Sequence, residues 1–173
     1  MKNQALKTLI EAQMKEVLLA LHTVSEEEFT KRPTTEKWSI AENLAHLTFS
    51  AKVFNKALNA PKIYLWYKFG KRKIGSRPFN EIKDQYYKAS FPAVTGFEPR
   101  MPTKLDMSHE IAAFERAHQN MIKSIDQWND AQLDTYLLPQ LVLGKLTVRE
   151  MTQFMAFHMG HHLLAIKAAK SGQ

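Results

Sequence analysis

The sequence contains no cysteine. Disulfide frameworks, thiolate nucleophiles and zinc sites with cysteine ligands are therefore excluded, and any metal ligands must come from other side chains. The absence of cysteine also fits a reducing compartment, so we expect a cytoplasmic protein.

Long apolar runs are missing as well. No stretch of the chain approaches the roughly 20 apolar residues that a membrane-spanning helix needs. Residues 1–19 carry charges throughout and lack the uninterrupted apolar region of a signal peptide. We therefore expect neither a membrane span nor an export signal.

Acidic residues are scarce relative to basic ones, since 17 aspartates and glutamates face 24 lysines and arginines, for a formal net charge of +7. Much of the excess lies in residues 62–77, which contain lysines and arginines but no acid. The rest of the chain is close to balanced. One basic segment is a weaker signal than a basic face running through a whole domain, so we do not expect nucleic-acid binding.

The basic segment 62–77 also carries the aromatic residues Tyr64, Trp66, Tyr67 and Phe69. Three interpretations are open: a short amphipathic helix that packs its aromatics and solvates its lysines, a lid that recruits an anionic substrate, and a surface for nucleic acid or membrane. We favour the packed helix, with the substrate-facing lid next.

Length and composition predict one globular domain that spans residues 1–173. Hydrophobic residues make up 45% of the chain and charged residues 24%, as in ordinary soluble domains. A chain of 173 residues can bury a stable core without disulfides or structural metals. Any metal site is therefore free to serve a function rather than to hold the fold together.

Four segments show the apolar spacing of helices, at about residues 3–22, 39–60, 106–128 and 147–173, and none shows the alternation of a strand. Capping boxes at Ser39–Glu42 and Thr147–Glu150 mark the starts of the second and fourth segments. The second and third segments are separated by about 45 residues rich in proline. We predict an all-α four-helix bundle with a long, partly helical connection between helices 2 and 3.

Two of the seven histidines, His158 and His162, lie four residues apart on the fourth predicted helix. This spacing places both imidazoles on one helix face, about 5–6 Å apart, where they can chelate one ion. A zinc-protease motif is excluded because it requires glutamate directly after the first histidine, and that position is Met159. The pair needs a third ligand from another helix.

His46 is the best candidate for that third ligand. It lies on the second predicted helix, in a row of small or mildly polar side chains that runs from Asn43 to Ala57 and suits the edge of an interior cavity. The alternative is a half-buried histidine whose ring is satisfied by a backbone carbonyl. The remaining histidines are expected at a rim or interface (His161), in the core (His118) and at helix ends (His22 and His109).

Three short motifs support this arrangement: Pro33-x4-Trp38-Ser39-x2-Glu42-x3-His46-Leu47, Gly144-x-Leu146-Thr147-x2-Glu150 and His158-x3-His162-Leu163. In their order and spacing the chain resembles the DinB-like superfamily, also described as YfiT-like metal-dependent hydrolases. The resemblance covers nearly the whole chain. It implies a four-helix bundle, often a homodimer, with one Zn or Ni ion bound by three histidines, which correspond to His46, His158 and His162.

The resemblance also implies a range of activities. Some relatives are linked to thiol-dependent S-transfer with bacillithiol, mycothiol or glutathione-like cofactors, whereas many others have no demonstrated activity. We therefore expect a metal-dependent hydrolase or a small-thiol-dependent S-transferase that acts on an unknown small molecule. The alternative is a non-catalytic metal-binding or protein-interaction module on the same bundle. The family gives no strong reason to expect DNA binding.

Two residues beside His46 are candidates for catalysis. Glu42 lies one turn before His46 and could act as a general base, although its place in the capping box favours a structural role. Asn43 could hydrogen-bond a metal ligand or a bound water, or lie on the solvated surface. Three protein nitrogens with open coordination positions are typical of a catalytic metal site, where the ion activates either water or a thiol.

Overall fold

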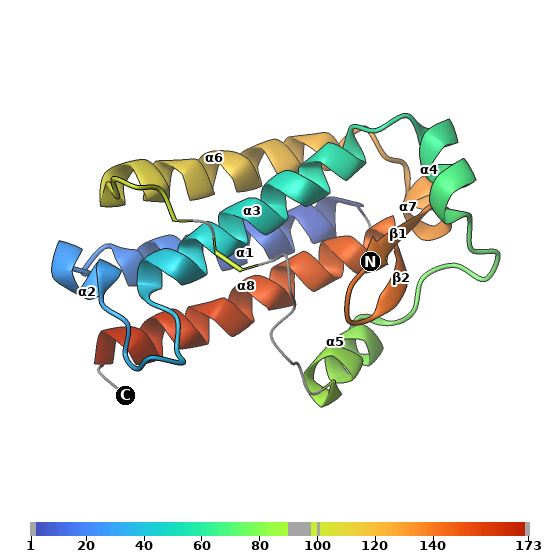
Figure 1. The fold of residues 1–173 in the computed structure, drawn as a ribbon. Coiled ribbons are helices and arrows are strands. Elements are labelled where there is room, and N and C mark those ends of the chain that lie inside the picture. Colours follow the sequence, from blue (N-terminus) through green and yellow to red (C-terminus); the bar gives the residue numbers. More distant parts are fainter. Residues whose placement is uncertain (1–2, 90–97, 100, 172–173) are drawn as a thin grey trace.

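The computed structural model describes residues 3–89, 98–99 and 101–171. Four long helices form the body of the molecule (Figure 1): α1 (Asn3–Leu21), α3 (Ile40–Leu58), α6 (Met107–Ile125) and α8 (Val148–Ser171). Helix α3 packs against α6 and α8, and α1 packs against the same two helices. The predicted all-α four-helix bundle is confirmed.

Both predicted capping boxes are present. The Ser39 hydroxyl accepts a hydrogen bond from the Glu42 backbone N–H (3.2 Å), and the Glu42 carboxylate accepts one from the Ser39 N–H (2.8 Å). Thr147 and Glu150 form the same reciprocal pair before α8. Because each box satisfies backbone donors that a helix leaves unpaired, the starts of α3 and α8 are well defined.

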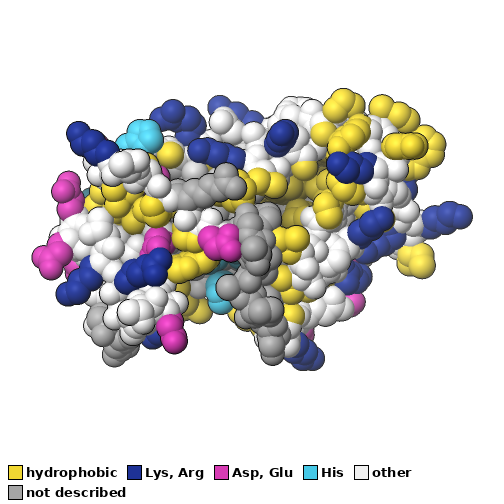
Figure 2. Space-filling view, in the orientation of Figure 1, with side chains coloured by type: hydrophobic (Ala, Val, Ile, Leu, Met, Phe, Trp, Pro, Cys, Tyr) yellow, Lys and Arg dark blue, Asp and Glu magenta, His cyan; other side chains and the backbone are white. Residues whose placement is uncertain are grey.

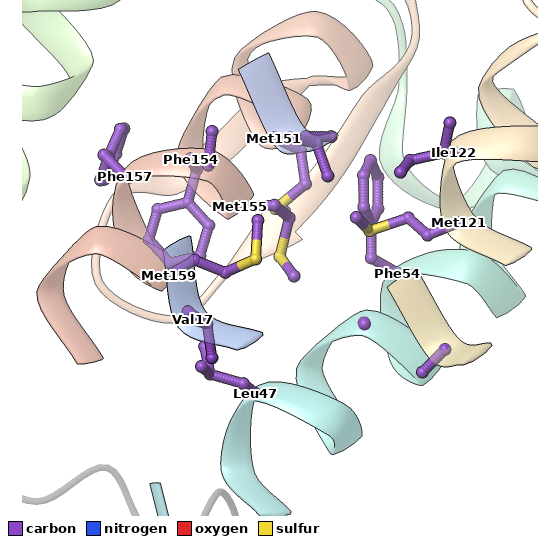
Figure 3. Close-up of a cluster of buried hydrophobic side chains, with 14 of the residues drawn as sticks. Val17, Leu47, Phe54, Met121, Ile122, Met151, Phe154, Met155, Phe157 and Met159 are labelled. Atoms are coloured by element: carbon purple, nitrogen blue, oxygen red, sulfur yellow. The ribbon is translucent and has the colours of Figure 1, made fainter. Parts of the chain in front are cut away.

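The core between the long helices is rich in methionine. Met121 of α6 and the α8 residues Met151, Met155 and Met159 are buried, and Figure 3 shows their side chains filling the space between α8, α3 and α6. Unbranched methionine adapts to irregular gaps, and each such side chain contributes about 1.5–3 kcal/mol by leaving water. The bundle thus has an apolar core that is independent of any metal.

Among the described residues, four shorter helices flank the bundle: α2 (Glu26–Thr30), α4 (Lys62–Phe69), α5 (Phe79–Lys88) and α7 (Asp130–Thr135). Helices α4 and α5 lie in the connection between α3 and α6, as the prediction of a partly helical connection requires. Helix α6 begins after Asp106, whose carboxylate accepts a hydrogen bond from the His109 N–H (2.9 Å), and it ends at Ile125 rather than at Trp128.

A small antiparallel sheet was not predicted. Strand β1 (Leu137–Gln140) pairs with β2 (Gly144–Thr147), so that Leu137 lies opposite Thr147 and Gln140 opposite Gly144. Strands of four residues are too short for their alternation to be distinguished from chance. Gly144 has a φ of +73°, a backbone conformation that favours glycine at a tight turn. Since Thr147 also caps α8, the hairpin leads directly into that helix.

The favoured interpretation of residues 62–77 is correct for the short helix but wrong for most of its aromatic rings. These residues do form a short helix, α4, but Leu65 alone is fully buried on it, whereas Trp66 is 51% and Tyr67 92% exposed. Helix α4 lies at one end of the bundle and packs against β1. A helix with one such neighbour can bury only a narrow stripe of side chains, so most of its aromatic rings remain in contact with solvent.

His118 lies in the core, as expected. Its side chain is fully buried on α6, and its ring Nδ1 donates a hydrogen bond to the Phe114 carbonyl (2.8 Å). Burial lowers the pKa of His118 to about 4, against a smaller opposing effect of this hydrogen bond. His118 is therefore a neutral, structural histidine.

In the described part of the chain, none of the helices has the length and hydropathy needed to cross a bilayer.

Candidate metal centre

The bundle brings together three histidines from two helices. His46 projects from α3, and His158 and His162 project from successive turns of α8. All three side chains are buried, with exposed fractions of 8%, 6% and 7%. Because both helices are capped and packed in the bundle, the three rings are held on rigid elements, as a precise metal site requires.

The ring nitrogens converge on one point. The Nε2 atom of His158 lies 3.2 Å from Nε2 of His46 and 3.1 Å from Nε2 of His162. One nitrogen from each ring lies within 4.8 Å of the other two. In tetrahedral zinc sites, metal–nitrogen bonds of about 2.0–2.1 Å separate the nitrogens by roughly 3.3 Å. The spacing of the three rings therefore fits a single divalent ion.

Asn43 orients one of these rings. Its side-chain nitrogen donates to the Ser39 carbonyl (2.8 Å) and to the Trp38 carbonyl (3.3 Å), so its side-chain oxygen must point the other way, at Nδ1 of His162 (2.7 Å). An amide oxygen only accepts hydrogen bonds, so Nδ1 of His162 carries the proton. The unprotonated Nε2 of His162 then faces the other two histidines, as a metal ligand must.

Burial disfavours the charged form of the two α8 histidines. Desolvation holds the pKa of both His158 and His162 well below the usual value, and the neighbouring histidines, His46 among them, lower it further. Metal ions bind the neutral form of imidazole. The Nδ1 atom of His158 is buried and has no hydrogen-bond partner among the described residues, whereas its Nε2 atom faces the Nε2 atoms of His46 and His162.

Aromatic rings surround the three histidines. The Trp38 ring stacks on His162, with centroids 5.9 Å apart and an interplanar angle of 10°, and the Phe154 ring stacks on His158 at 5.0 Å. A tyrosine from the long connection also lies beside the histidines: the ring centroid of Tyr86, on α5, is 6.3 Å from that of His158. Burial, with a smaller effect of Tyr87, raises the pKa of Tyr86 to about 12. Tyr86 was not predicted, because nothing in the sequence relates the long connection to α8.

A cavity of about 940 Å³ adjoins the three histidines. Its wall includes all three ligand candidates together with Asn43, Tyr86 and His161. Much of the remaining wall is apolar, formed by Phe54, Met151, Phe154, Met155 and other side chains. The volume suits a small organic molecule, and a few convergent polar groups in an apolar wall are typical of a ligand site.

Glu42 is engaged away from the cavity wall. Its carboxylate accepts hydrogen bonds from the Ser39 N–H and from the guanidinium of Arg32, including one from Nε at 2.8 Å. Burial by itself would raise the pKa of Glu42, but the Arg32 and Ser39 contacts outweigh it and hold the pKa below its usual value. The predicted capping role is confirmed, whereas a role as general base stays a prediction.

Replacing Asn43 by alanine is expected to weaken Zn binding about 10- to 100-fold, because His162 loses the hydrogen bond that fixes its ring and its tautomer. Competition with a chromophoric chelator would measure the change in affinity. Ser50→Ala is the matched control, since Ser50 is also buried on α3 and lines the cavity. Equal affinities of the Asn43→Ala variant and the wild type would show that Asn43 does not support the site.

Comparison with known proteins identifies one family. The family model of the DinB superfamily matches residues 9–166, a range that includes all three histidines. No curated protein and no solved structure matches the chain.

Proposed function

The chain belongs to the DinB superfamily, and from this membership and its site we propose that it is a metal-dependent enzyme. Zn or Ni would be held by His46, His158 and His162. The observation that carries the proposal is that these three buried nitrogens meet at the wall of a large cavity. A structural zinc site has four protein ligands, whereas three ligands beside a cavity leave room for a substrate.

The nucleophile that we propose is a small thiol, with water as the second candidate. When bound, the metal ion would lower the pKa of a coordinated thiol or water and so supply a nucleophile near neutral pH. A free thiol ionises with a pKa of about 8.5 and water with one of about 15.7, so a thiol needs far less help. Glu42, the base predicted for a hydrolase, is already paired with Arg32.

The side chains of this site have separate proposed roles. Asn43 positions His162 through its hydrogen bond. Trp38 and Phe154 restrict the ligand rings by stacking. The largely apolar wall of the cavity favours a second substrate with a sizeable apolar group. We propose that His161, which is half-buried beside the site, contacts this substrate rather than the metal.

Removing the metal is expected to lower turnover at least about 100-fold, since no other activating group of this strength is proposed. The measurement compares chelator-treated protein with protein reconstituted with one equivalent of Zn or Ni. Conjugation of glutathione or cysteine to monochlorobimane reports S-transfer, and p-nitrophenyl acetate reports hydrolysis.

The outcomes distinguish the candidate functions. Recovery of conjugation on adding metal supports the S-transferase, and recovery of ester cleavage alone supports the hydrolase. A protein that binds one ion tightly but turns over neither probe favours the non-catalytic metal-binding or protein-interaction module.

The proposal also includes a homodimer and a cytoplasmic location. Light scattering in solution would check the oligomeric state, and cell fractionation would check the location.

A further inference from the structure

The end of the molecule formed by α4 and the loop after it exposes apolar and basic side chains together. Its apolar members are exposed by 46–96% and are Ile63, Tyr64, Trp66, Tyr67 and Ile74. Its basic members are also exposed and are Lys68, Lys71 and Lys73. We call these eight residues the α4 face. Figure 2 shows hydrophobic side chains gathered over α4, with lysine and arginine side chains beside them.

The α4 face carries positive charge alone. No acid occurs between residues 62 and 77, and the two arginines of that segment turn inward to Glu150. Two of the exposed lysines lie over aromatic rings: Nζ of Lys71 lies 4.9 Å from the centroid of Trp66, and Nζ of Lys68 lies 5.3 Å from that of Tyr64. The α4 face is therefore one continuous surface on which positively charged and apolar side chains lie next to each other.

We propose that the α4 face docks the protein on an anionic lipid surface. Tryptophan and tyrosine rings favour the headgroup level of a bilayer, where one side is apolar and the other wet. Exposed aliphatic side chains such as Ile63 and Ile74 can enter the boundary with the acyl chains. Lysines beside them attract anionic headgroups. All three kinds of side chain occur together on this face.

Other occupants fit the surface less well. Single-stranded nucleic acid would stack its bases on the aromatic rings. Ile74 is 96% exposed and has no ring on which a base could stack, so nucleic acid would leave this apolar side chain in water. A second copy in a two-fold contact would place this face against itself. Lys68, Lys71 and Lys73 would then approach lysines of the same charge, which opposes association.

The α4 face also borders the cavity at the metal centre. Tyr64 belongs to both, and its neighbours Leu65 and Phe69 line the cavity as well. A docked molecule would hold the cavity next to the bilayer, where apolar compounds are concentrated. Delivery of an apolar substrate by this route rests on the proposed function, whereas docking itself does not.

Sedimentation with lipid vesicles tests the proposal. The full-length protein should bind vesicles of mixed phosphatidylcholine and phosphatidylglycerol, bind phosphatidylcholine alone far more weakly, and dissociate as salt is raised. The triple variant Lys68→Glu/Lys71→Glu/Lys73→Glu should bind at least about 100-fold more weakly, because the loss of each lysine near an anionic surface costs about fivefold and each new carboxylate is repelled by the anionic headgroups. Trp66→Ala/Ile74→Ser should lose about tenfold through its apolar contacts.

Matched controls separate docking from general effects of charge and hydrophobicity. Lys15→Glu/Lys52→Glu/Lys123→Glu makes the same change in net charge at exposed positions of α1, α3 and α6. Leu19→Ser removes an apolar side chain that is 57% exposed on α1. Both controls should bind vesicles like the wild type, and circular dichroism checks that every variant is folded.

Several results would overturn the proposal. These are no binding to anionic vesicles at low salt, or binding that the α4-face variants leave unchanged. Tight binding of a single-stranded oligonucleotide without vesicle binding would assign the face to nucleic acid. A dimer that only Trp66→Ala/Ile74→Ser dissociates, again without vesicle binding, would assign it to a second copy. None of these outcomes depends on metal binding or turnover, so docking can fail while the proposed enzyme stands.

Discussion

Replacing His158 by alanine is expected to abolish stoichiometric Zn or Ni binding while the bundle stays folded. The Nε2 atom of His158 lies 3.2 Å from that of His46 and 3.1 Å from that of His162, so the substitution removes one of three converging ligands and leaves two. We expect a fall in metal affinity on the order of 1,000-fold, since one ligand of a tight zinc site contributes several kcal/mol. Elemental analysis and chelator competition would measure it.

The fold should survive this change because the His158 side chain adjoins the cavity as well as the core. Circular dichroism and thermal unfolding would confirm it. His118→Phe is the matched control: His118 is another buried histidine, on α6 and outside the group of three, and its replacement should leave metal binding intact. A His158→Ala variant that still binds one ion with wild-type affinity would contradict the proposed ligand set.

Replacing Glu150 by glutamine is expected to lower the free energy of unfolding by about 3 kcal/mol, because breaking a buried ion pair leaves its partners uncompensated. The Glu150 side chain is fully buried. Its carboxylate accepts hydrogen bonds from the Thr147 N–H (3.0 Å), from the Arg77 N–H (2.7 Å) and from the guanidinium groups of Arg72 and Arg77. It thus joins the start of α8 to the basic segment.

Glu28→Gln provides the control for this prediction. Glu28 closes a capping box with Ser25 on α2, as Glu150 does with Thr147, but this box is exposed. Its loss should cost much less stability than the loss of Glu150, because solvent can replace the exposed contacts of Glu28. Urea unfolding of both variants would give the comparison, and equal losses would show that Glu150 acts as a simple cap rather than as the centre of a buried network.

The same network predicts the sign of a pH dependence. Burial would raise the pKa of Glu150, but the hydrogen bonds and charge of Arg77 outweigh it and hold the pKa below its usual value of 4.5. A lowered folded-state pKa means that the stabilisation is present above the unfolded-state pKa and is lost as the pH falls through the folded-state value. Below pH 4.5 the stability of Glu150→Gln should therefore fall less steeply than that of the wild type.

Much of the fold could be predicted from the sequence because it depends on local patterns. The apolar spacing of about 3.6 residues identifies each long helix, and the reciprocal contacts of Ser39 with Glu42 and of Thr147 with Glu150 involve residues three positions apart. The spacing of His158 and His162 is local in the same sense. The β1–β2 hairpin escaped prediction because its strands are too short to show a pattern.

In the candidate site, too, the sequence predicts what depends on local spacing but not what depends on the packing of distant helices. That His46 meets the α8 pair depends on the relative rotation of α3 and α8, which no spacing within one helix specifies. The motif order of the DinB superfamily supplied that information indirectly. Tyr86 joins the site because α5 packs on α8, and this long-range contact left no signal in the sequence.

The sequence by itself determined the four long helices, two of their caps and the pair of histidines on α8, since each follows from interactions within a few residues. The tertiary structure alone decided what those residues meet. In the folded chain Asn43 hydrogen-bonds His162, and Arg72 and Arg77 pair with the buried carboxylate of Glu150. Most aromatic rings of α4 remain exposed because few side chains pack over them. The physical reason is that burial and pairing depend on elements that are distant in the chain, and they become defined only when the helices pack.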